Sequence, residues 1–261
     1  MYRSYWQLQR KPFENTPDPE FFFPSHEHEE ALERLQYVVN ENKGAALLTG
    51  DYGTGKTTII RKVAYDAQAN NIAVAYLNNP KWAAEELLQE VLYQLGESDI
   101  PDSALELGRK IGDVLYDNMV DGRSTLIIID EAQIIKSDNV FEELRLLLNY
   151  QMNDSFMVTL ILSGQPELRE RILAIPQFEQ RMFIKYHFHM FDLDNTSAYI
   201  RHRLKIAGVE REIFSKDAVE LIYQHSFGTP RRINNICDLA LLTGFKKNAP
   251  LINSNIIRAI V

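Results

Sequence analysis

The sequence predicts an α/β fold in which helices cover both faces of a parallel five-stranded sheet, followed by a small all-helical domain. Between residues 44 and 189, short apolar segments alternate with longer segments of helical spacing, which is typical of a parallel sheet. After about Asp192 only helical segments follow. We therefore expect an N-terminal segment over 1–24, an α/β core over 25–191 and a helical lid over 192–261.

The first 24 residues are rich in proline and aromatic residues and predict an extended segment. Pro12, Pro17, Pro19 and Pro24 recur here, and each proline fixes its own φ and keeps the preceding residue out of the helical region. Aromatic side chains would be costly to leave in water along a free tail. We therefore expect this segment to pack on the core.

A helix with Ser25 as its N-cap candidate should run to about residue 42, because acidic residues follow the cap and apolar residues recur at helical spacing. The sheet strands are expected at 44–49, 72–77, 125–130, 157–163 and 183–189. The helices between them are expected at 56–68, 83–95, 103–119, 140–151 and 167–173. The strand at 125–130 shows no polar alternation, as expected for a strand covered on both faces.

The C-terminal region predicts four helices, which we interpret as a lid domain. They are expected at 196–207, 215–226, 231–246 and 253–260. Ser215 is a plausible N-cap, and Asp217 adds a negative charge to the first turn of the second helix, where it suits the helix dipole.

Composition and charge exclude several classes of protein. Hydrophobic residues make up 45% and charged residues 25% of 261 residues, the balance of a soluble globular protein. The single cysteine, Cys237, excludes an internal disulfide framework and fits a reducing compartment. We see no secretory signal, and no apolar run near the roughly 20 residues that cross a bilayer. We therefore expect a cytoplasmic protein without membrane insertion.

The net charge of −8 argues against a free-standing nucleic-acid binder. Such a protein would neutralise phosphates with Lys and Arg side chains. A local basic groove built by several subunits remains compatible with this charge.

A glycine-rich stretch between the first expected strand and the next helix predicts a phosphate-binding loop. Residues 50–57, with the sequence Gly-Asp-Tyr-Gly-Thr-Gly-Lys-Thr, match the pattern G-x-x-x-x-G-K-[S/T]. Glycines let the backbone amides wrap around a phosphate, and the following helix adds its positive N-terminal end. Lys56 should reach the β- and γ-phosphates of ATP, and the hydroxyl of Thr57 should bind Mg²⁺. The expected nucleotide-binding residues of the loop are Gly50, Gly53, Thr54, Gly55, Lys56, Thr57 and Thr58.

Two carboxylates end the apolar strand at 125–130 and predict the metal and water site. Ligands of open α/β sheets sit at the carboxyl ends of the strands. Asp130 would hold Mg²⁺ through its water shell, and Glu131 would polarise the water that attacks the γ-phosphate.

The fourth expected strand ends in polar residues that could sense the γ-phosphate. Ser163 and Gln165 are both candidates, since either side chain would lie beside the acidic pair. We include Ser163 in the candidate site and keep Gln165 as its alternative.

Two arginine positions predict transition-state and sensing roles. Arg181 precedes the last strand, where an arginine can enter a neighbouring subunit's nucleotide pocket; Arg169 and Arg171 are the alternatives. Arg231 opens a lid helix and could reach back to the γ-phosphate, with Arg232 as its alternative. A basic start is slightly unfavourable with the helix dipole, which suggests an anionic partner.

These motifs together resemble the AAA+ superfamily of P-loop NTPases and, within it, the ExeA (general secretion pathway protein A) type. The resemblance covers about the whole chain. Besides the phosphate loop it rests on Tyr5-Trp6-Gln7-Leu8, Lys11-Pro12-Phe13, Thr16-Pro17-Asp18-Pro19, Asp130-Glu131-Ala132-Gln133, Gly164-Gln165-Pro166-Glu167-Leu168, Gln180-Arg181, Tyr199-Ile200-Arg201-His202-Arg203-Leu204 and Gly228-Thr229-Pro230-Arg231-Arg232-Ile233-Asn234.

The resemblance implies an ATPase with strand order 5-1-4-3-2, a helical lid and assembly into a hexamer-like ring or a filament. On this basis we expect ATP and Mg²⁺ as cofactors and a protein machine of secretion, pilus or envelope assembly as partner. The core also resembles the TnsC and TniB transposition regulators, which polymerise on DNA with ATP. DNA is therefore the alternative partner, and the basic clusters Arg201-His202-Arg203-Leu204-Lys205 and Lys246-Lys247 are its candidate contacts.

Overall fold

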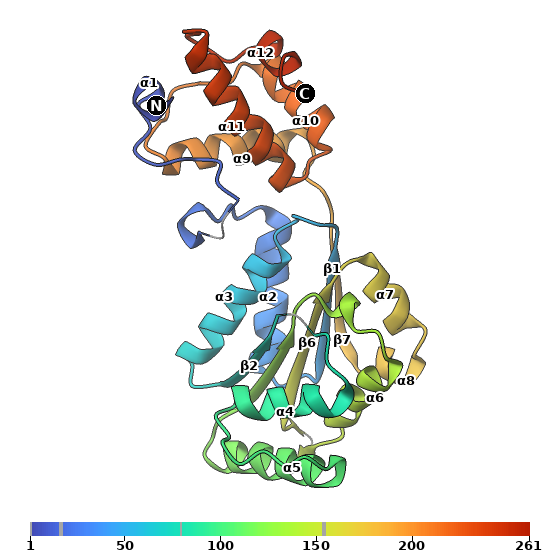
Figure 1. The fold of residues 1–261 in the computed structure, drawn as a ribbon. Helices are drawn as coiled ribbons and strands as arrows, with labels where there is room; N and C mark the ends of the chain where they lie inside the picture. The colour runs from blue at the N-terminus through green and yellow to red at the C-terminus, as the bar shows by residue number, and fades with distance from the viewer. Residues whose placement is uncertain (1, 16–17, 79, 153–154) are drawn as a thin grey trace. The chain divides into compact units, whose positions relative to one another are not determined.

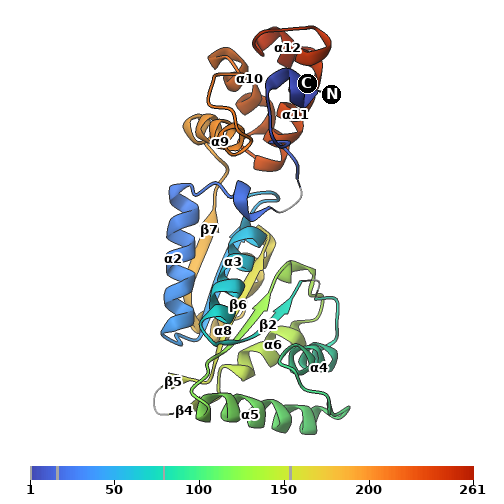
Figure 2. The same ribbon diagram turned by 90° about the vertical axis from the view of Figure 1, so that its left-hand side faces the viewer.

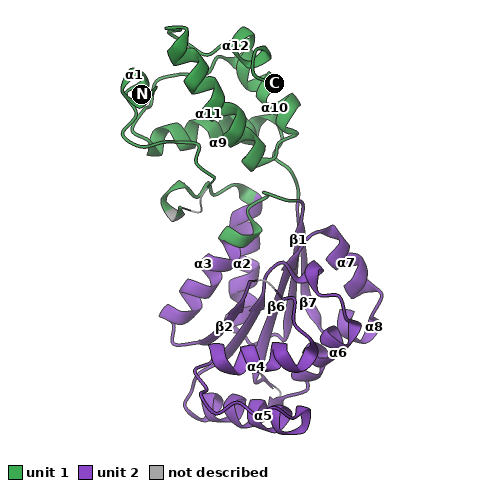
Figure 3. Cartoon of the chain, in the orientation of Figure 1, with its two compact units in different colours: residues 1–26, 52–58, 189–261 green, residues 27–51, 59–188 purple. Residues whose placement is uncertain are grey.

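The computed structural model describes residues 2–15, 18–78, 80–152 and 155–261, which divide into two compact units (Figure 3). The first, here called the sheet unit, consists of residues 27–51 and 59–188. The second, here called the helical unit, consists of residues 1–26, 52–58 and 189–261. The expected boundaries near residues 24 and 191 stay predictions.

The sheet unit is built on five parallel strands in the order β2-β3-β6-β1-β7 (Figure 1). The strands are β1 (Ala45–Gly50), β2 (Ala73–Leu77), β3 (Thr125–Ile129), β6 (Val158–Gly164) and β7 (Met182–Phe188). Numbered one to five along the chain and counted from the β7 edge, they give the expected order 5-1-4-3-2. Every residue of the three central strands β1, β3 and β6 is buried, which explains their continuous apolar sequences.

Helices cover both faces of this sheet (Figure 2). α2 (His26–Asn40) and α3 (Lys56–Ala69) cover one face. The other face packs into one hydrophobic cluster with α4 (Ala84–Gln94), α5 (Ala104–Val120), α6 (Asp138–Leu147), α7 (Pro166–Leu173) and α8 (Pro176–Glu179).

Four short elements of the sheet unit were not expected. A 3-10 helix, η2 (Ala132–Ile134), follows the acidic pair, and α8 begins with a proline in its first turn. The helix expected to reach residue 151 ends at Leu147, because the chain turns there into the small hairpin β4 (Gln151–Met152) and β5 (Ser155–Phe156). Each of these elements spans four residues or fewer, too few for a periodic pattern.

The helical unit has its own hydrophobic cluster. It contains α9 (Leu193–Ile206), α10 (Lys216–Ser226), α11 (Pro230–Lys246) and α12 (Ser254–Arg258). All four expected lid helices are present, although the first begins three residues earlier than predicted and the last is shorter.

The N-terminal segment belongs to this helical cluster, and not to the hydrophobic cluster of the α/β core on which we expected it to pack. The expectation of a fully extended segment is wrong for α1 (Tyr2–Trp6) and for η1 (Pro19–Phe21), a 3-10 helix. No proline precedes residue 12, so α1 can form, and Gln7 ends it in the left-handed region. Thr16 and Pro17 lie outside the described residues.

Trp6 fixes this segment to α11. Its side chain is fully buried, and Nε1 donates a hydrogen bond to the carbonyl oxygen of Leu241 over 2.9 Å. A Cβ atom on Gly244 would lie 2.8 Å from the Trp6 ring, so glycine makes the close approach possible.

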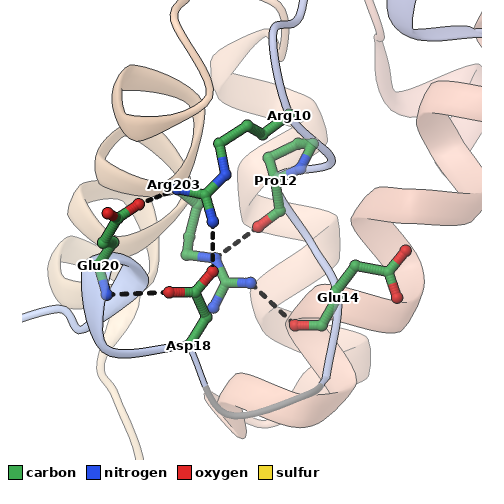
Figure 4. Close-up of polar contacts among 6 residues, drawn as sticks. All are labelled: Arg10, Pro12, Glu14, Asp18, Glu20 and Arg203. Atoms are coloured by element: carbon green, nitrogen blue, oxygen red, sulfur yellow. Dashed lines mark hydrogen bonds and ion pairs between the residues drawn. The ribbon is translucent and has the colours of Figure 1, made fainter.

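Arg203 of α9 fastens the segment a second time (Figure 4). Its guanidinium donates hydrogen bonds to the carbonyl oxygens of Pro12 and Glu14, the latter over 2.9 Å, and to the hydroxyl of Tyr199 over 3.1 Å. It also lies over the Phe21 ring, 4.6 Å from the centroid. Within the N-terminal segment itself, Arg10 forms ion pairs with Asp18 and Glu20. A buried cation is tolerated here because its nitrogens have partners.

Among the helices of the described residues, none combines the length and apolar character required to cross a membrane.

Candidate functional site

The phosphate loop connects β1 to α3 as the sequence predicts. Gly53 and Gly55 have φ of 78° and 98°, a region that residues with a side chain rarely adopt. Thr54 and Lys56 are buried, with 2% and 6% of their surface exposed. The loop therefore places a glycine-rich backbone and one buried lysine at the start of a helix. This is an arrangement that binds phosphate in proteins.

The loop also contacts the start of α11. A Cβ atom on Gly53 would lie 3.1 Å from Cβ of Arg231 and 3.3 Å from the methyl of Thr229. The turn before α11 requires glycine too, since a Cβ on Gly228 would lie 1.8 Å from the carbonyl oxygen of Phe191. Arg231 thus starts its helix beside the phosphate loop, as a phosphate-sensing arginine requires.

Asp130 lies at the carboxyl end of β3, in the sheet unit. It is 3% exposed, and its backbone N–H continues the ladder to Leu77 over 2.8 Å. Its Oδ2 accepts a hydrogen bond from the hydroxyl of Tyr76 over 3.3 Å. Burial raises the pKa of Tyr76, and the Asp130 charge raises it further, so this phenol stays a neutral donor.

Glu131 has φ of 54°, in the left-handed region. Its Oε2 accepts a hydrogen bond from the side-chain amide of Gln133 over 2.6 Å. No role was assigned to Tyr76 or Gln133 from the sequence. For Gln133 the available signal was its position two residues after Glu131, although many polar residues in such positions are only solvated. Tyr76 lies 54 positions before Asp130, so no local pattern pointed to it.

Ser163 lies on β6, next to the strand that carries the acidic pair. Ile129 pairs with Leu162, so Asp130 and Ser163 each follow one member of this pair. The Ser163 hydroxyl is fully buried and has no hydrogen-bond partner among the described residues. A buried polar atom without a partner is unusual and marks a position where a ligand or water can complete it. Gln165 is partly exposed, and its backbone N–H binds Gln133 over 3.1 Å.

The arginines near β7 differ in how they are engaged. Arg171 donates to the carbonyl oxygen of Ile135, pairs with Asp138 over 2.9 Å and lies over the Phe141 ring. Arg181 donates a hydrogen bond to the neutral side chain of Asn149 over 3.1 Å. A guanidinium with several partners in its own unit is less able to serve a neighbouring subunit, so Arg181 is favoured over Arg171.

The basic stretch on α9 does not form a continuous basic face. Arg203 points inward, as described above. The groove beside α9 has a volume of about 550 Å³ and a balanced set of charged residues. The basic ones are Arg201, Lys205, Arg211 and Lys216, and the acidic ones are Asp194, Glu210, Glu212 and Glu220. This groove gives little support to DNA binding.

The family model of the AAA domain matches residues 39–172, about half of the chain. The chain belongs to the AAA domain family. General secretion pathway protein A of Aeromonas hydrophila is 33% identical over 252 residues, which are 95% of this chain and 46% of that protein. This confirms the resemblance to that type, although the chain spans less than half the length of that relative.

Solved structures show the same fold. The ORC2 protein of Aeropyrum pernix, in ADPNP-ADP complexes, has a TM-score of 0.69 at 17% identity, over 96% of this chain and 71% of that chain. The RuvB Holliday junction branch migration motor of Thermotoga maritima has a TM-score of 0.59 at 18% identity, over 88% and 67%. At these identities the likeness confirms the AAA+ P-loop fold alone.

The residues present fit a nucleotide with Mg²⁺. The glycine loop and buried Lys56 suit a polyphosphate, and the Ser163 hydroxyl is left to bind a ligand. Among the described residues no group of three or more His, Cys, Asp or Glu side chains could hold a metal by itself. Mg²⁺ suits such a protein, because it usually binds one or two protein oxygens together with substrate phosphates.

Proposed function

We propose that this protein binds ATP with Mg²⁺ and hydrolyses it to drive the assembly or remodelling of a partner protein complex. The observation that carries the proposal is the loop between β1 and α3, with positive φ at Gly53 and Gly55 and a buried Lys56. The similarity to general secretion pathway protein A supports the class of partner, a secretion, pilus or envelope machine.

Binding would depend on the loop and the start of α3. The backbone amides from about Gly53 to Thr57 would donate to phosphate oxygens, and Lys56 would neutralise the β- and γ-phosphates. Thr57 and Asp130 would hold Mg²⁺, which lowers the charge repulsion at the phosphates. Arg231, beside Gly53, would contact the γ-phosphate and report its presence to α11.

Hydrolysis would depend on Glu131. Its carboxylate would accept a proton from the water as that oxygen bonds to the γ-phosphorus and the bond to the β,γ-bridging oxygen breaks. Ser163 would orient the water or the γ-phosphate with its buried hydroxyl.

Glu131→Gln separates binding from turnover. We expect the affinity for ATP to stay within about 3-fold, while the turnover number falls by roughly 100-fold or more because the proton acceptor is lost. ATP binding by fluorescence titration and phosphate release on the same preparation measure both quantities. Normal turnover would show that another residue activates the water.

Assembly would place Arg181 in the site of a neighbouring subunit. Arg181→Ala alone should be inactive, and an excess of it mixed with Glu131→Gln should recover activity, because some sites then combine the intact Glu131 of one subunit with the intact Arg181 of another. Phosphate release across mixing ratios measures this, and the same mixing with Arg169→Ala tests the alternative arginine. No recovery at any ratio would contradict a shared site.

A DNA-dependent regulator is the other function that this type of core allows. The buried Arg203 and the charge-balanced groove beside α9 support it less. Sedimentation with a non-hydrolysable ATP analogue, with and without duplex DNA, distinguishes the two. Assemblies that form without DNA support the proposal, and assemblies that require DNA contradict it. The cytoplasmic location stays a prediction.

A further inference from the structure

The side chain of Gln133 joins two turns at the carboxyl edge of the sheet unit. Its Nε2 donates to Oε2 of Glu131 over 2.6 Å, and its Oε1 accepts from the backbone N–H of Gln165 over 3.1 Å. One amide group therefore contacts both the turn after β3 and the turn after β6.

The two contacts fix the orientation of this amide. A carboxylate only accepts hydrogen bonds, and a backbone N–H only donates. The NH₂ of Gln133 must therefore face Glu131, and the carbonyl must face Gln165. An inverted amide would lose both bonds at once.

Glu131 needs such support because of its backbone. A left-handed conformation at a residue with a side chain is strained by about 1–3 kcal/mol and persists only where its surroundings hold it. The following turn supplies one restraint, since the N–H of Ile134 donates to the Glu131 carbonyl oxygen over 2.9 Å. Gln133 supplies the contact to the carboxylate itself.

The carbonyl oxygen of the Gln133 side chain packs directly against the backbone of Gly164. A Cβ atom on Gly164 would lie 2.6 Å from Oε1 of Gln133 and 2.7 Å from Cδ2 of Leu168. Glycine at this position lets the amide reach the turn that directly follows Ser163. Movement of that turn would be passed to Glu131 through a single side chain.

We propose that Gln133 is a positioning residue for hydrolysis, which orients the Glu131 carboxylate and couples it to the turn after β6. The inference rests on the proposed ATPase function and adds a residue to it. Gln133 needs no contact with the nucleotide for this role.

Gln133→Met is the first test, because methionine keeps the length and volume but makes neither hydrogen bond. We expect the kcat to fall roughly 10- to 100-fold, since a small misplacement of a catalytic group has effects of this size. The KM and the affinity for ATP should stay within about 2-fold. Gln89→Met on α4 is the matched control, because it also loses a glutamine bond to backbone, at Pro101, and should keep the wild-type kcat.

The double variant Glu131→Gln with Gln133→Met tests whether Gln133 acts through Glu131. If it does, the double variant should have the kcat of Glu131→Gln within about 2-fold, because residues that act as a unit have non-additive effects. Losses that multiply would overturn the inference and assign Gln133 a separate effect on the fold.

The contact can also be measured without nucleotide. The side-chain amide signal of Gln133, assigned by its disappearance in Gln133→Met, should move in Glu131→Gln because its charged acceptor is gone. An unchanged signal would overturn the inference.

A wild type that binds ATP without hydrolysing it would instead overturn the proposed function, and the positioning role with it. Wild-type turnover in Gln133→Met would overturn this inference alone.

Discussion

In the helical unit the buried guanidinium of Arg203 has hydrogen-bond partners for its nitrogens, whereas in the sheet unit the buried hydroxyl of Ser163 has none among the described residues. Arg203 joins α9 to the N-terminal segment, far away in sequence. The Ser163 hydroxyl forms no hydrogen bond within the described residues, and it lies at the carboxyl end of β6 beside the acidic pair. Both side chains are polar and buried, yet the first has the surroundings of a structural residue and the second those of a ligand-binding residue.

This contrast teaches how to separate the two roles of buried polar groups. A satisfied group contributes to stability, and its loss leaves partners unpaired. An unsatisfied group costs stability in the free protein, and where it lies at a strand end beside other polar groups it marks a position that a ligand can complete. The carboxyl edge of the sheet unit, with the strained Glu131 and the unpartnered Ser163, has the second character.

Lys56→Ala should give the largest functional effect. We expect the affinity for ATP to fall by about 100-fold or more, because a hydrogen bond to a charged group contributes about 3 kcal/mol. Isothermal titration with ATP and Mg²⁺ measures this. Lys62→Ala is the control on the same helix, where an exposed lysine pairs with Asp66, and it should bind as the wild type does. Tight binding by Lys56→Ala would break the assignment of the phosphate loop.

Arg203→Met should give the largest loss of stability in the comparison. It leaves the carbonyl oxygens of Pro12 and Glu14 without their donor, so the free energy of unfolding should fall by about 2–4 kcal/mol. Denaturant unfolding followed by tryptophan fluorescence reports it, since Trp6 lies in the same cluster. The exposed Arg201→Met on the same helix should cost little. A loss no larger than that of Arg201→Met would contradict the structural role.

Ser163→Ala should have the smallest effect on stability. We expect the free energy of unfolding to stay within about 0.5 kcal/mol of wild type or to rise, because no hydrogen bond in the described structure is lost. The turnover number should nevertheless fall roughly 10- to 100-fold. Thr159→Val is the matched control, since among the described residues its hydroxyl is also buried and unpartnered on β6, but it lies near the amino end of the strand, away from the carboxyl end that carries Ser163. It should leave turnover unchanged.

The sequence was sufficient for features that local chemistry dictates. The phosphate loop needs glycines at fixed positions, and fully covered parallel strands need continuous apolar runs. The strand order came from the resemblance. The family match confirms the resemblance, and the observed sheet confirms the order. The roles of the individual site residues stay predictions, for which the buried Lys56 and Ser163 supply support.

The remaining features depend on contacts between distant residues. Arg203 looked like one member of a basic stretch, and only the carbonyl groups of residues 12 and 14 show that it points inward. Gln133 looked like an ordinary polar residue until the turn after β6 was seen beside it. The helix α1 forms in a segment whose later prolines predicted an extended chain. Trp6 is buried against α11, and the partly buried Tyr2 and Tyr5 pack on the same hydrophobic cluster.

The bond between Trp6 and Leu241 spans 235 positions, and this has a consequence for synthesis on the ribosome. The residues around Trp6 cannot find these partners until residue 241 has been translated. The sheet unit can form in the meantime, since domains generally fold as units in the order of their synthesis. Until then Trp6 and Phe13 lack the partners that bury them in the finished unit, and hydrophobic surface exposed in this way during folding is prone to aggregation.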